Sequence, residues 1–381
     1  MQPPLAALRF PVSESRGRRH AEAPHPYRNA FQRDRDRIVH ARAFRRLEDK
    51  TQVFTAGLSD HFRNRLTHTI EVSQIARTAA AALGLDEDLT EALALVHDIG
   101  HPPFAHAGEE ELDRQMRRFG ERFNHNLHAL RIVERFEQRY ARFPGLNLTF
   151  EVREGIVKHS RELAPGENPD LEEYLPGLRP PLEAQLIDPA DEIAYSTADL
   201  DDAFSARFFT LEQLRGSVPQ YAEVCAAAGR EFPQASQRLR FQEALRRLID
   251  RLVSGLIEGT RATALEAGVC NVEQVRHHAE RLARFTPAAQ ALSSALKEFL
   301  HRRVYSAETL AEERRRATGL IAELFQFFLE EPDRLPRAYR EETARRRVHR
   351  VVRDYIAGMT DGFLRRTHHE LVAGGGAEAS S

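Results

Sequence analysis

The sequence predicts an all-α fold. Apolar residues recur at mixed spacings of three and four residues in segment after segment, which is the period of an amphipathic helix. No segment shows the sustained alternation of apolar and polar residues that is typical of a half-buried strand. No internal period of about 20 to 50 residues indicates a solenoid. We therefore expect a bundle of unlike helices.

Start and stop signals frame the predicted helices in the first half of the chain. Gly84 ends the second helix, Asp86 is a plausible N-cap of the third, and Gly100 with Pro102 ends the third. Pro189 falls inside the last helix, so it must be a first-turn proline or a kink. The predicted helices of this half cover residues 33–54, 60–83, 86–99, 109–119, 127–142, 150–159 and 182–204.

The second half continues the helical period. Residues 161–181, which precede the predicted helix of residues 182–204, are dense in proline, glycine and acidic residues, which predicts a long surface loop. The later helices are predicted in residues 237–259, 272–285, 286–304, 306–328 and 340–364.

The chain divides by composition into four parts. Residues 1–26 lack hydrophobic periodicity and are predicted to be a flexible segment. Residues 27–205 are rich in histidine and form the predicted core with its site, whereas residues 206–368 are rich in arginine. We expect this second region to pack on the core and to take part in oligomer contacts. Residues 369–381 are predicted to be a disordered tail.

Composition excludes several classes of protein. With 41% hydrophobic and 29% charged residues, the chain is typical of a globular protein, and no apolar run approaches the roughly 18 to 20 residues of a membrane span. The net charge of -2 excludes the basic excess of a dedicated nucleic-acid binder. Cys225 and Cys270 are too few for a disulfide scaffold. Because no secretory signal is visible, we expect a cytoplasmic protein.

The densest chemical segment runs from Leu95 to Glu109 and includes the adjacent residues His97 and Asp98. The predicted helix places this pair in its last turn, where exposed carbonyl groups make the helix end partly negative. Asp98 is disfavoured there by a few tenths to about one kcal/mol unless a cation lies beside it. A bound metal ion would supply that cation. A solvated aspartate beside a capping histidine is the alternative.

Two other segments carry groups of the same kind. His68 precedes Val72 and Ile75 at helical spacing, so it extends an apolar face and should point inward. A metal ligand and a core histidine bonded to a backbone carbonyl both fit that position. Asp191 shares a helix face with Tyr195, and this face is directed toward the core if Tyr195 is buried.

Two imidazoles and two carboxylates from three helices form a mixed set of nitrogen and oxygen donors. Such a set suits a divalent ion such as manganese, iron, cobalt, zinc or magnesium, and it leaves coordination positions open. The ligand types do not distinguish among these ions.

The order of His68, His97-Asp98 and Asp191 resembles the metal-binding signature of the HD-domain phosphohydrolase superfamily. The longer phrases around these residues are similar to the deoxyguanosinetriphosphate triphosphohydrolase branch in its shorter bacterial form. This resemblance implies an HD-domain helical bundle with additional C-terminal helices. The phrases are FQRDRDRIVHARAFRRLEDKTQVF, RLTHTIEV, LVHDIGHPPFAHAGEEEL, FNHNLHALRIVE, GLNLTFEVREGI, LEAQLIDPADEIAYSTADLDDAF and DYIAGMTDGF.

The resemblance implies a metal-dependent hydrolase that converts a deoxynucleoside triphosphate (dNTP) to deoxynucleoside and inorganic triphosphate. Its metal ligands would be His68, His97, Asp98 and Asp191. The ion would be Mn²⁺ or Mg²⁺, with Fe²⁺, Co²⁺, Ni²⁺ and Zn²⁺ as alternatives. One rival is an HD-domain phosphohydrolase that acts on a nucleoside monophosphate or a guanosine alarmone. Another is a nucleotide-sensing or nucleic-acid-binding protein.

The resemblance also implies a group of catalytic residues. His106 matches the family's catalytic histidine, and Glu109, one helical turn later, matches its orienting acid. His101 and His125 match further histidines that approach the phosphates or relay protons. Taken alone, His106 reads equally well as a capping residue and Glu109 as a partner of the helix dipole.

Four positions match substrate contacts by the same resemblance, and Lys158, one of only three lysines in the chain, is a fifth candidate. An aromatic ring at Tyr195 would leave no room for a 2′-hydroxyl group, which gives deoxyribose selectivity a steric reason. A core tyrosine and solvated polar residues are the alternatives at these positions. The positions are Gln52 for the 3′-hydroxyl, Arg65 for the nucleotide, Tyr195 and Asp199 for the sugar pocket, and Lys158 for a phosphate.

Family members assemble as rings or stacked dimers, so we expect a homo-oligomer, either a tetramer or a hexamer. A dNTP activator is a further expected ligand. The arginine runs at residues 314–316 and 345–347 alternate with acidic residues, which is typical of solvated faces or of salt bridges between subunits. A nucleotide or single-stranded DNA site is the alternative reading of these runs.

Overall fold

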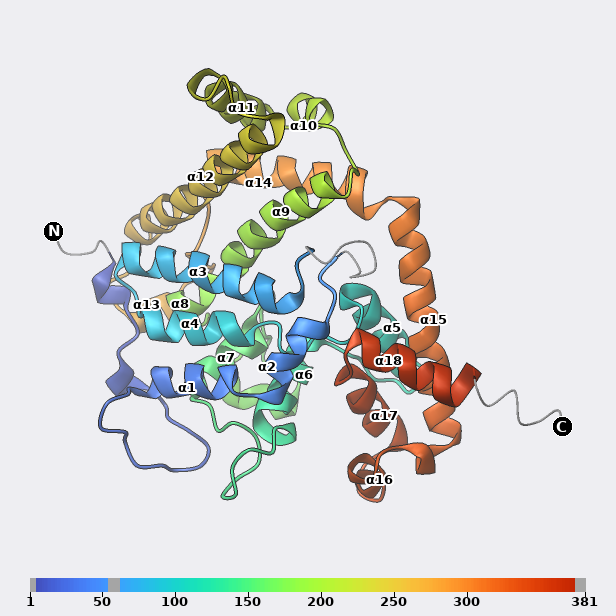
Figure 1. Cartoon of the computed structure of the whole chain (residues 1–381). Coiled ribbons are helices and arrows are strands. Elements are labelled where there is room, and N and C mark those ends of the chain that lie inside the picture. Colours follow the sequence, from blue (N-terminus) through green and yellow to red (C-terminus); the bar gives the residue numbers. More distant parts are fainter. Residues whose placement is uncertain (1–4, 54–61, 374–381) are drawn as a thin grey trace. The chain divides into compact units, whose positions relative to one another are not determined.

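The computed structural model describes residues 5–53 and 62–373 of the chain (Figure 1). Within these residues the regular structure is helical, and no β-strand occurs. The only extended pairings among them are isolated bridges of Arg18 with Thr149, Thr51 with Asn64 and Tyr140 with Phe143. The all-α prediction is therefore confirmed. None of the helices in the described ranges is both long enough and apolar enough to cross a membrane.

The chain folds into two compact units that alternate along the sequence. Unit 1 contains the described residues of Met1–Ile38, His68–Val96 and Asn147–Ala307. Unit 2 contains those of Val39–Thr67, His97–Leu146 and Glu308–Ser381. The predicted division into contiguous parts, with boundaries at residues 26, 205 and 368, therefore differs from this grouping by contacts and stays a prediction.

Unit 1 is built around α9, which packs on α12 and α14, and around α4, which packs on α7 and α8. Its α-helices are α1 (Ala30–Val39), α3 (Arg65–Leu83), α4 (Glu87–Val96), α7 (Phe150–Lys158), α8 (Leu182–Gln185), α9 (Ile187–Ser205), α10 (Leu211–Ser217), α11 (Pro219–Glu231), α12 (Gln237–Glu266), α13 (Val272–His277) and α14 (Pro287–Leu300). The last residue of α1 and the first three residues of α3 fall in unit 2. Its short 3-10 and π helices are η1 (Ala6–Leu8), η2 (Val12–Glu14), η5 (Pro169–Tyr174) and η6 (His301–Tyr305).

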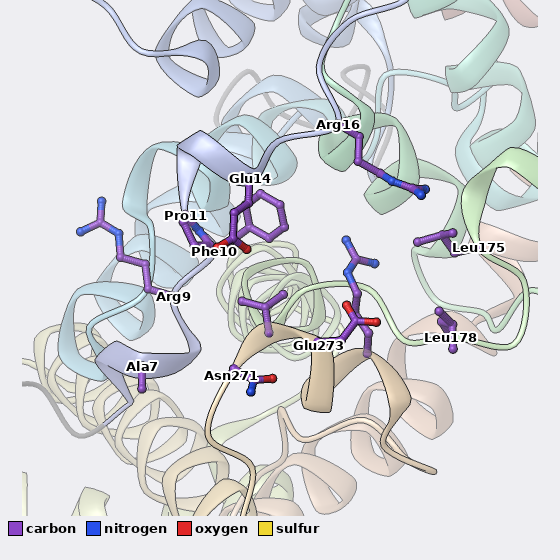
Figure 2. Close-up of a pocket in the computed structure, with 12 residues that line it drawn as sticks. Ala7, Arg9, Phe10, Pro11, Glu14, Arg16, Leu175, Leu178, Asn271 and Glu273 are labelled. Atoms are coloured by element: carbon purple, nitrogen blue, oxygen red, sulfur yellow. The ribbon is translucent and has the colours of Figure 1, made fainter.

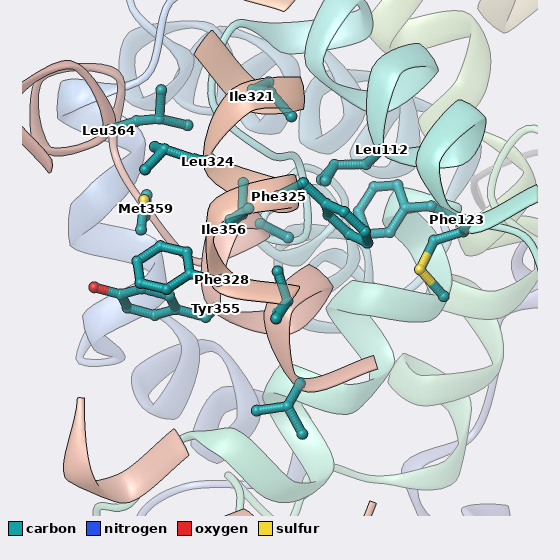
Figure 3. Packing of buried hydrophobic residues seen from close by; sticks show 14 of the residues in the cluster. Leu112, Phe123, Ile321, Leu324, Phe325, Phe328, Tyr355, Ile356, Met359 and Leu364 are labelled. Atoms are coloured by element: carbon teal, nitrogen blue, oxygen red, sulfur yellow. The ribbon is translucent and has the colours of Figure 1, made fainter. Parts of the chain in front are cut away.

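Unit 2 has a core in which α15 packs on α5 and α17. Its α-helices are α2 (Arg42–Arg45), α5 (Ala105–Arg117), α6 (His125–Arg131), α15 (Glu308–Glu330), α16 (Arg337–Thr343), α17 (Val348–Ala357) and α18 (Asp361–His368). Its short 3-10 and π helices are η3 (Arg46–Asp49), η4 (Ile132–Phe136), η7 (Pro332–Arg334) and η8 (His369–Ala373). Figure 3 shows part of this core, in which Phe328 lies beside Tyr355 with ring centroids 5.3 Å apart. Each such side chain contributes about 1.5–3 kcal/mol on full burial.

Both chain ends differ from the prediction where they are described. Residues 5–26 contain η1 and η2 and bury Leu5, Leu8 and Phe10, and the amide of Phe10 donates to Glu183 Oε1 at 2.8 Å. Three apolar residues thus order a segment whose overall composition predicts flexibility. In the predicted tail, residues 369–373 form η8. The rest of the tail, residues 374–381, lies outside the described residues.

Several predicted helices are divided in the structure. The predicted helix over residues 33–54 is replaced by α1, α2 and η3, because Glu137 Oε1 accepts the amide of Ala43 at 2.7 Å and starts a new helix there. Residues 340–364 form parts of three helices, since Thr360 caps α18. The prediction missed α10 and α11, although Thr210 and Gln213 form a capping box and Pro219 opens α11.

Helix α12 depends on a glycine for its packing. A Cβ atom on Gly259 would lie 2.3 Å from the carbonyl oxygen of Arg284, whereas a Cβ atom on Gly319 of α15 would meet nothing within 4 Å. We expect Gly259→Ala to lower the free energy of unfolding by about 1–3 kcal/mol or more. Gly319→Ala should raise it by about 0.5–1 kcal/mol, because alanine is the better helix former. Urea unfolding followed by circular dichroism measures both. Equal effects of the two substitutions would contradict this packing.

Candidate active site

Unit 2 surrounds the carboxylate of Asp98 with cationic and imidazole groups. Helix α4 ends at Val96, so His97 and Asp98 lie in the turn just after the helix and not in its last turn as predicted. Arg65 Nη1 donates to Asp98 Oδ2 at 2.5 Å. The Nε2 atoms of His101 and His97 lie 3.1 and 3.5 Å from Asp98 Oδ1. Asp98 is 4% exposed.

These neighbours decide the charge of Asp98. Burial alone would raise its pKa, but the positive charge of Arg65 and the imidazoles of His97 and His101 hold the pKa of Asp98 well below its usual value. The carboxylate is therefore ionised. Burial, followed by the charges of Arg65 and His125, lowers the pKa of His101 well below its ordinary value, so this imidazole is neutral.

A second cluster of unit 2 joins three of the predicted catalytic residues to His101. The ring of His101 stacks on His125 with centroids 3.9 Å apart, and it meets the ring of His106 edge-on at 5.3 Å. Glu109 Oε1 accepts the backbone amide of His125 at 2.9 Å, and both carboxylate oxygens of Glu109 lie 2.9 Å from His125 Nδ1. His106 Nδ1 is 3.8 Å from Glu109 Oε2.

The Glu109 carboxylate stays ionised within this cluster. Burial would raise its pKa, but the nearby imidazole of His106 and the hydrogen bond from His125 hold the pKa of Glu109 far below its usual range. His106 is the exposed member, with 78% of its side chain accessible to solvent, whereas Glu109 is 17% accessible. A histidine that is open to solvent on one side and oriented by a carboxylate on the other is suited to proton transfer. Potential ligand atoms of His101, His106 and Glu109 all lie within 4.8 Å of one another.

Local sequence explains why these side chains meet. A Cβ atom on Gly100 would lie 2.1 Å from the carbonyl oxygen of His125, so only glycine lets the two backbones approach this closely. Gly108 meets the carbonyl of Pro103 in the same way, with 1.9 Å to an added Cβ atom. Asn124 caps α6 by accepting the amide of Leu127 at 3.2 Å, which fixes the start of the helix at His125.

Unit 1 pairs the other two predicted metal ligands. His68 is 1% exposed, which confirms the prediction that it points inward. Its Nε2 atom lies 2.9 Å from Asp191 Oδ1. Pro189 is the third residue of α9 and therefore a first-turn proline, so the helix that carries Asp191 continues without a break.

The predicted sugar-pocket residues lie further along α9. The hydroxyl of Tyr305 donates to Asp199 Oδ2, and Asp199 is 3% exposed. Burial and the charges of Glu192 and Asp191 raise the pKa of Tyr195, so its hydroxyl group is neutral. Tyr195 and Asp191 both line a cleft of about 880 Å³ in unit 1.

The wall of this cleft contains an ion-pair network that the sequence analysis missed. His159 Nδ1 lies 2.6 Å from Asp188 Oδ1, and Arg281 donates to Asp188 Oδ2 and to the carbonyls of Lys158 and Arg161. Asp188 comes three residues before Asp191 on α9. The only signal in the sequence was the acidic cluster around Asp191, because the partners of Asp188 come from distant segments.

Lys158 and Gln52 lie apart from these pairs. Lys158 is 1% exposed, and its Nζ atom donates to Glu154 Oε1 at 2.8 Å and to the carbonyls of Leu175 and Leu178 at 3.0 and 2.9 Å. These bonds use all three N–H groups of the ammonium. In unit 2, Gln52 has a buried Oε1 atom that finds no hydrogen-bond partner within residues 5–53 and 62–373.

A second cleft of unit 1, of about 520 Å³, includes none of the predicted site residues (Figure 2). Two of its three arginines are already paired. Arg9 bonds Asp86 at 2.7 Å, and Arg276 bonds Glu154 at 2.8 Å. The remaining charges of the cleft are Arg16, Glu14 and Glu273, which favour no single ligand charge.

The arginine runs form ion pairs with nearby acidic residues. Arg315 Nη2 lies 2.8 Å from Glu308, and Arg346 Nη1 lies 2.6 Å from Glu342. Arg315 fits the expected solvated face, whereas Arg346 is 28% exposed and also bonds the buried Asp354.

Comparisons with known proteins agree with the motifs. Residues 65–196 match the HD domain, and residues 283–370 match the phosphohydrolase-associated domain. A deoxyguanosinetriphosphate triphosphohydrolase-like protein of Bordetella pertussis is 45% identical over 376 residues, which cover 96% of each chain. Like-named proteins of Azoarcus sp. and Geobacter sulfurreducens are 47% and 44% identical over 372 and 361 residues. These alignments cover 97% of each chain for Azoarcus, and 94% of this chain and 92% of the relative for Geobacter.

One buried histidine of unit 2, His128, lies outside every predicted site. It is 1% exposed, and its Nδ1 atom is 3.7 Å from Asp354 Oδ1. Burial lowers the pKa of His128 to about 4, while the nearby carboxylate of Asp354 opposes this shift and the charges of Arg131 and Lys50 add to it. His128 is therefore neutral near pH 7 and structural in character.

This shift predicts a pH-dependent contribution to stability. An unfolded histidine has a pKa of about 6.5, so the unfolded chain binds one more proton than the folded chain between pH 6.5 and about 4. Stability contributed by neutral His128 is lost as the pH falls through this window. The difference in unfolding free energy between wild type and His128→Asn should therefore shrink by roughly 1.4 kcal/mol per pH unit. Denaturant titrations at several pH values measure it. A difference that is constant from pH 7 to 4.5 would refute the assignment.

Proposed function

Because the chain belongs to the deoxyguanosinetriphosphate triphosphohydrolase-like family and contains an HD domain, we propose that it hydrolyses deoxynucleoside triphosphates to deoxynucleoside and inorganic triphosphate. The observation that carries the proposal is on helix α3. Arg65 at the start of α3 binds Asp98, and His68, one turn later, pairs with Asp191. Each unit thus holds one of the two histidine and carboxylate pairs that the family signature requires.

The proposed metal ligands are His68, His97, Asp98 and Asp191. Their donor chemistry fits a divalent ion, because a buried ionised carboxylate and imidazole nitrogens are the forms that coordinate metals. His68 Nε2 and Asp191 Oδ1 lie 2.9 Å apart, which is close enough for one ion to bind both atoms. Mn²⁺ or Mg²⁺ is proposed, with Fe²⁺, Co²⁺, Ni²⁺ and Zn²⁺ as alternatives.

When bound, such an ion would supply Lewis acidity toward an α-phosphate oxygen and toward water. The chain supplies the remaining requirements. Arg65 offers a buried positive charge for the nucleotide, and neutral His101 offers a ring nitrogen for a phosphate or a proton. Charge on the triphosphate is best stabilised by groups that are held in place before the substrate arrives.

The leaving 5′-oxygen needs a proton, since an alkoxide is a poor leaving group near neutral pH. We assign its delivery to the cluster of His106, Glu109 and His125. Glu109 orients His106 and would stabilise its protonated form, and His106 is open to solvent for reprotonation. His125, held by the same carboxylate, is available to relay the proton.

For the substrate, Tyr195 and Asp199 are proposed to line the sugar pocket and Gln52 to bind the 3′-hydroxyl. Support for Tyr195 is that it borders a cleft that also contains Asp191, whereas Asp199 is buried and accepts the hydroxyl of Tyr305. The buried Gln52 Oε1 atom is an acceptor suited to a hydroxyl donor. A direct phosphate contact by Lys158 would require it to release the carbonyls of Leu175 and Leu178. The dNTP activator, the tetramer or hexamer, single-stranded DNA binding and the cytoplasmic location stay predictions.

The products of the reaction test the proposal. Protein loaded with Mn²⁺ or Mg²⁺ and incubated with each dNTP singly and in mixtures should release intact inorganic triphosphate, detected by ion-exchange chromatography. Asp98→Asn should lower the rate by about 100-fold or more, because it removes a charged ligand. Asp250→Asn, an exposed aspartate of α12, is the matched control and should keep the wild-type rate.

Release of phosphate or pyrophosphate in place of triphosphate would favour an HD-domain phosphohydrolase of another nucleotide. Nucleotide binding without turnover under any of the common divalent ions would favour a sensing protein. Either result would reject the proposed activity.

A second test concerns the pair of His106 and Glu109. If the two act together, His106→Gln and Glu109→Gln should each lower kcat by about 10² to 10⁴-fold, and the double variant should lose little more than either single variant. The exposed neighbour Glu110 on the same helix provides the control Glu110→Gln, which should not change kcat. Losses that multiply in the double variant would show that the two residues act independently.

A further inference from the structure

The loop that leads from Asp98 into α5 has an unfavourable backbone conformation. Phe104 and Ala105 both adopt left-handed conformations, with φ of 61° and 56°. Residues with side chains rarely occupy this region, and they stay there only when surrounding contacts hold them. The loop carries His101, and the helix that follows it begins with the turn of His106. Something in unit 2 must therefore hold this backbone in place.

Asp361, the first residue of α18, binds the loop from the C-terminal part of the chain. Its Oδ1 atom accepts the backbone amide of Phe104 at 3.0 Å, and its Oδ2 atom accepts the backbone amide of Thr51 at 2.9 Å. Phe104 is the first of the two left-handed residues. Arg365, one turn later on α18, lies over the ring of Phe104 with its guanidinium carbon 4.9 Å from the centroid.

Lys50, which immediately precedes Thr51 in the sequence, binds the same loop. Its Nζ atom donates to the carbonyl of His101 and, at 3.2 Å, to the carbonyl of Ala357 at the end of α17. Lys50 is 4% exposed, so its amino group makes these bonds away from bulk water. The amide of Arg65 in turn donates to the carbonyl of Lys50 at 3.1 Å.

These bonds fix both ends of the segment from His101 to Phe104. The His101 ring depends on this placement for its stacking on His125 and for its 3.1 Å contact with Asp98. An acidic residue in the first turn of a helix commonly interacts only with the N-terminal end of that helix. Both oxygens of Asp361 instead accept amides from other segments, which a purely local role would not produce.

We propose that Lys50 and Asp361 are positioning residues: they clamp the backbone of residues 101–104 and thereby set the orientation of His101 and the start of α5. Asp361 and Ala357, which Lys50 binds, both lie in the region that matches the phosphohydrolase-associated domain. This region therefore acts on the histidine cluster without contributing a catalytic residue. The kinetic consequence rests on the proposed function, whereas the structural clamp does not.

Amide exchange and kinetics test the proposal on the full-length protein. Asp361→Asn keeps the size of the side chain, but its amide group accepts at only one atom, so one backbone amide loses its partner. Lys50→Met keeps the length and removes the donor. Hydrogen exchange measured by mass spectrometry on a peptide spanning residues 99–107 reports the clamp directly. Asp333→Asn, an exposed aspartate in η7, is the control.

Both variants should exchange the amides of this peptide at least about tenfold faster than wild type and than Asp333→Asn, with unchanged exchange in α15. They should also lower kcat by about 10- to 100-fold, because the His101 ring packs against His106 and His125, which are proposed to deliver the proton. KM should stay within about threefold of wild type, because the other proposed substrate contacts are unchanged. If Asp361→Asn fails to fold, Lys50→Met decides the result.

Unchanged exchange in the peptide would overturn the proposal, as would faster exchange spread evenly over unit 2, which indicates general destabilisation. Faster exchange with wild-type kcat would also overturn it, since the loop would then have no effect on the chemistry. Absence of turnover in the wild type would reject the proposed function, and the exchange result alone would then decide the clamp.

Discussion

The structure depends most on the ionised carboxylate of Asp98. A buried carboxylate is costly unless its charge is compensated, and Arg65 and two imidazoles provide this compensation. Arg65 is itself 2% exposed, so neither charge can be removed without leaving the other uncompensated. The segments that carry them are thereby fixed relative to one another within unit 2. The same requirement explains why imidazole groups collect around Asp98.

Around this pair the backbone has little freedom. Gly100 and Gly108 allow two close backbone contacts, and Phe104 with Ala105 is held in an unfavourable conformation by Asp361. Such constraints are characteristic of sites where side chains must be oriented before a ligand binds. Helix α3 extends the arrangement, because the turn that begins with Arg65 is followed by His68 and its partner Asp191.

Sequence patterns predicted the features that depend on residues close together in the sequence. The all-α class follows from the spacing of apolar residues within each helix. The same kind of local spacing predicted the inward direction of His68 and the N-cap at Asp86, which accepts the amide of Leu89. Contacts between distant segments left no such pattern: His159 pairs with Asp188, Lys50 with the carbonyl of His101, and Arg276 with Glu154. Lys158 illustrates the limit, because its helical position is compatible with a solvated or a phosphate-binding lysine, and only the folded chain reveals the two carbonyls that it binds.

We propose that one divalent ion joins the two histidine and carboxylate pairs. Anomalous diffraction from crystals of the full-length protein grown with Mn²⁺ would detect this ion. We expect a single strong peak bonded by His68, His97, Asp98 and Asp191. A peak at another cluster, a peak bonded by only one of the two pairs, or no peak at a saturating concentration of Mn²⁺ would contradict it.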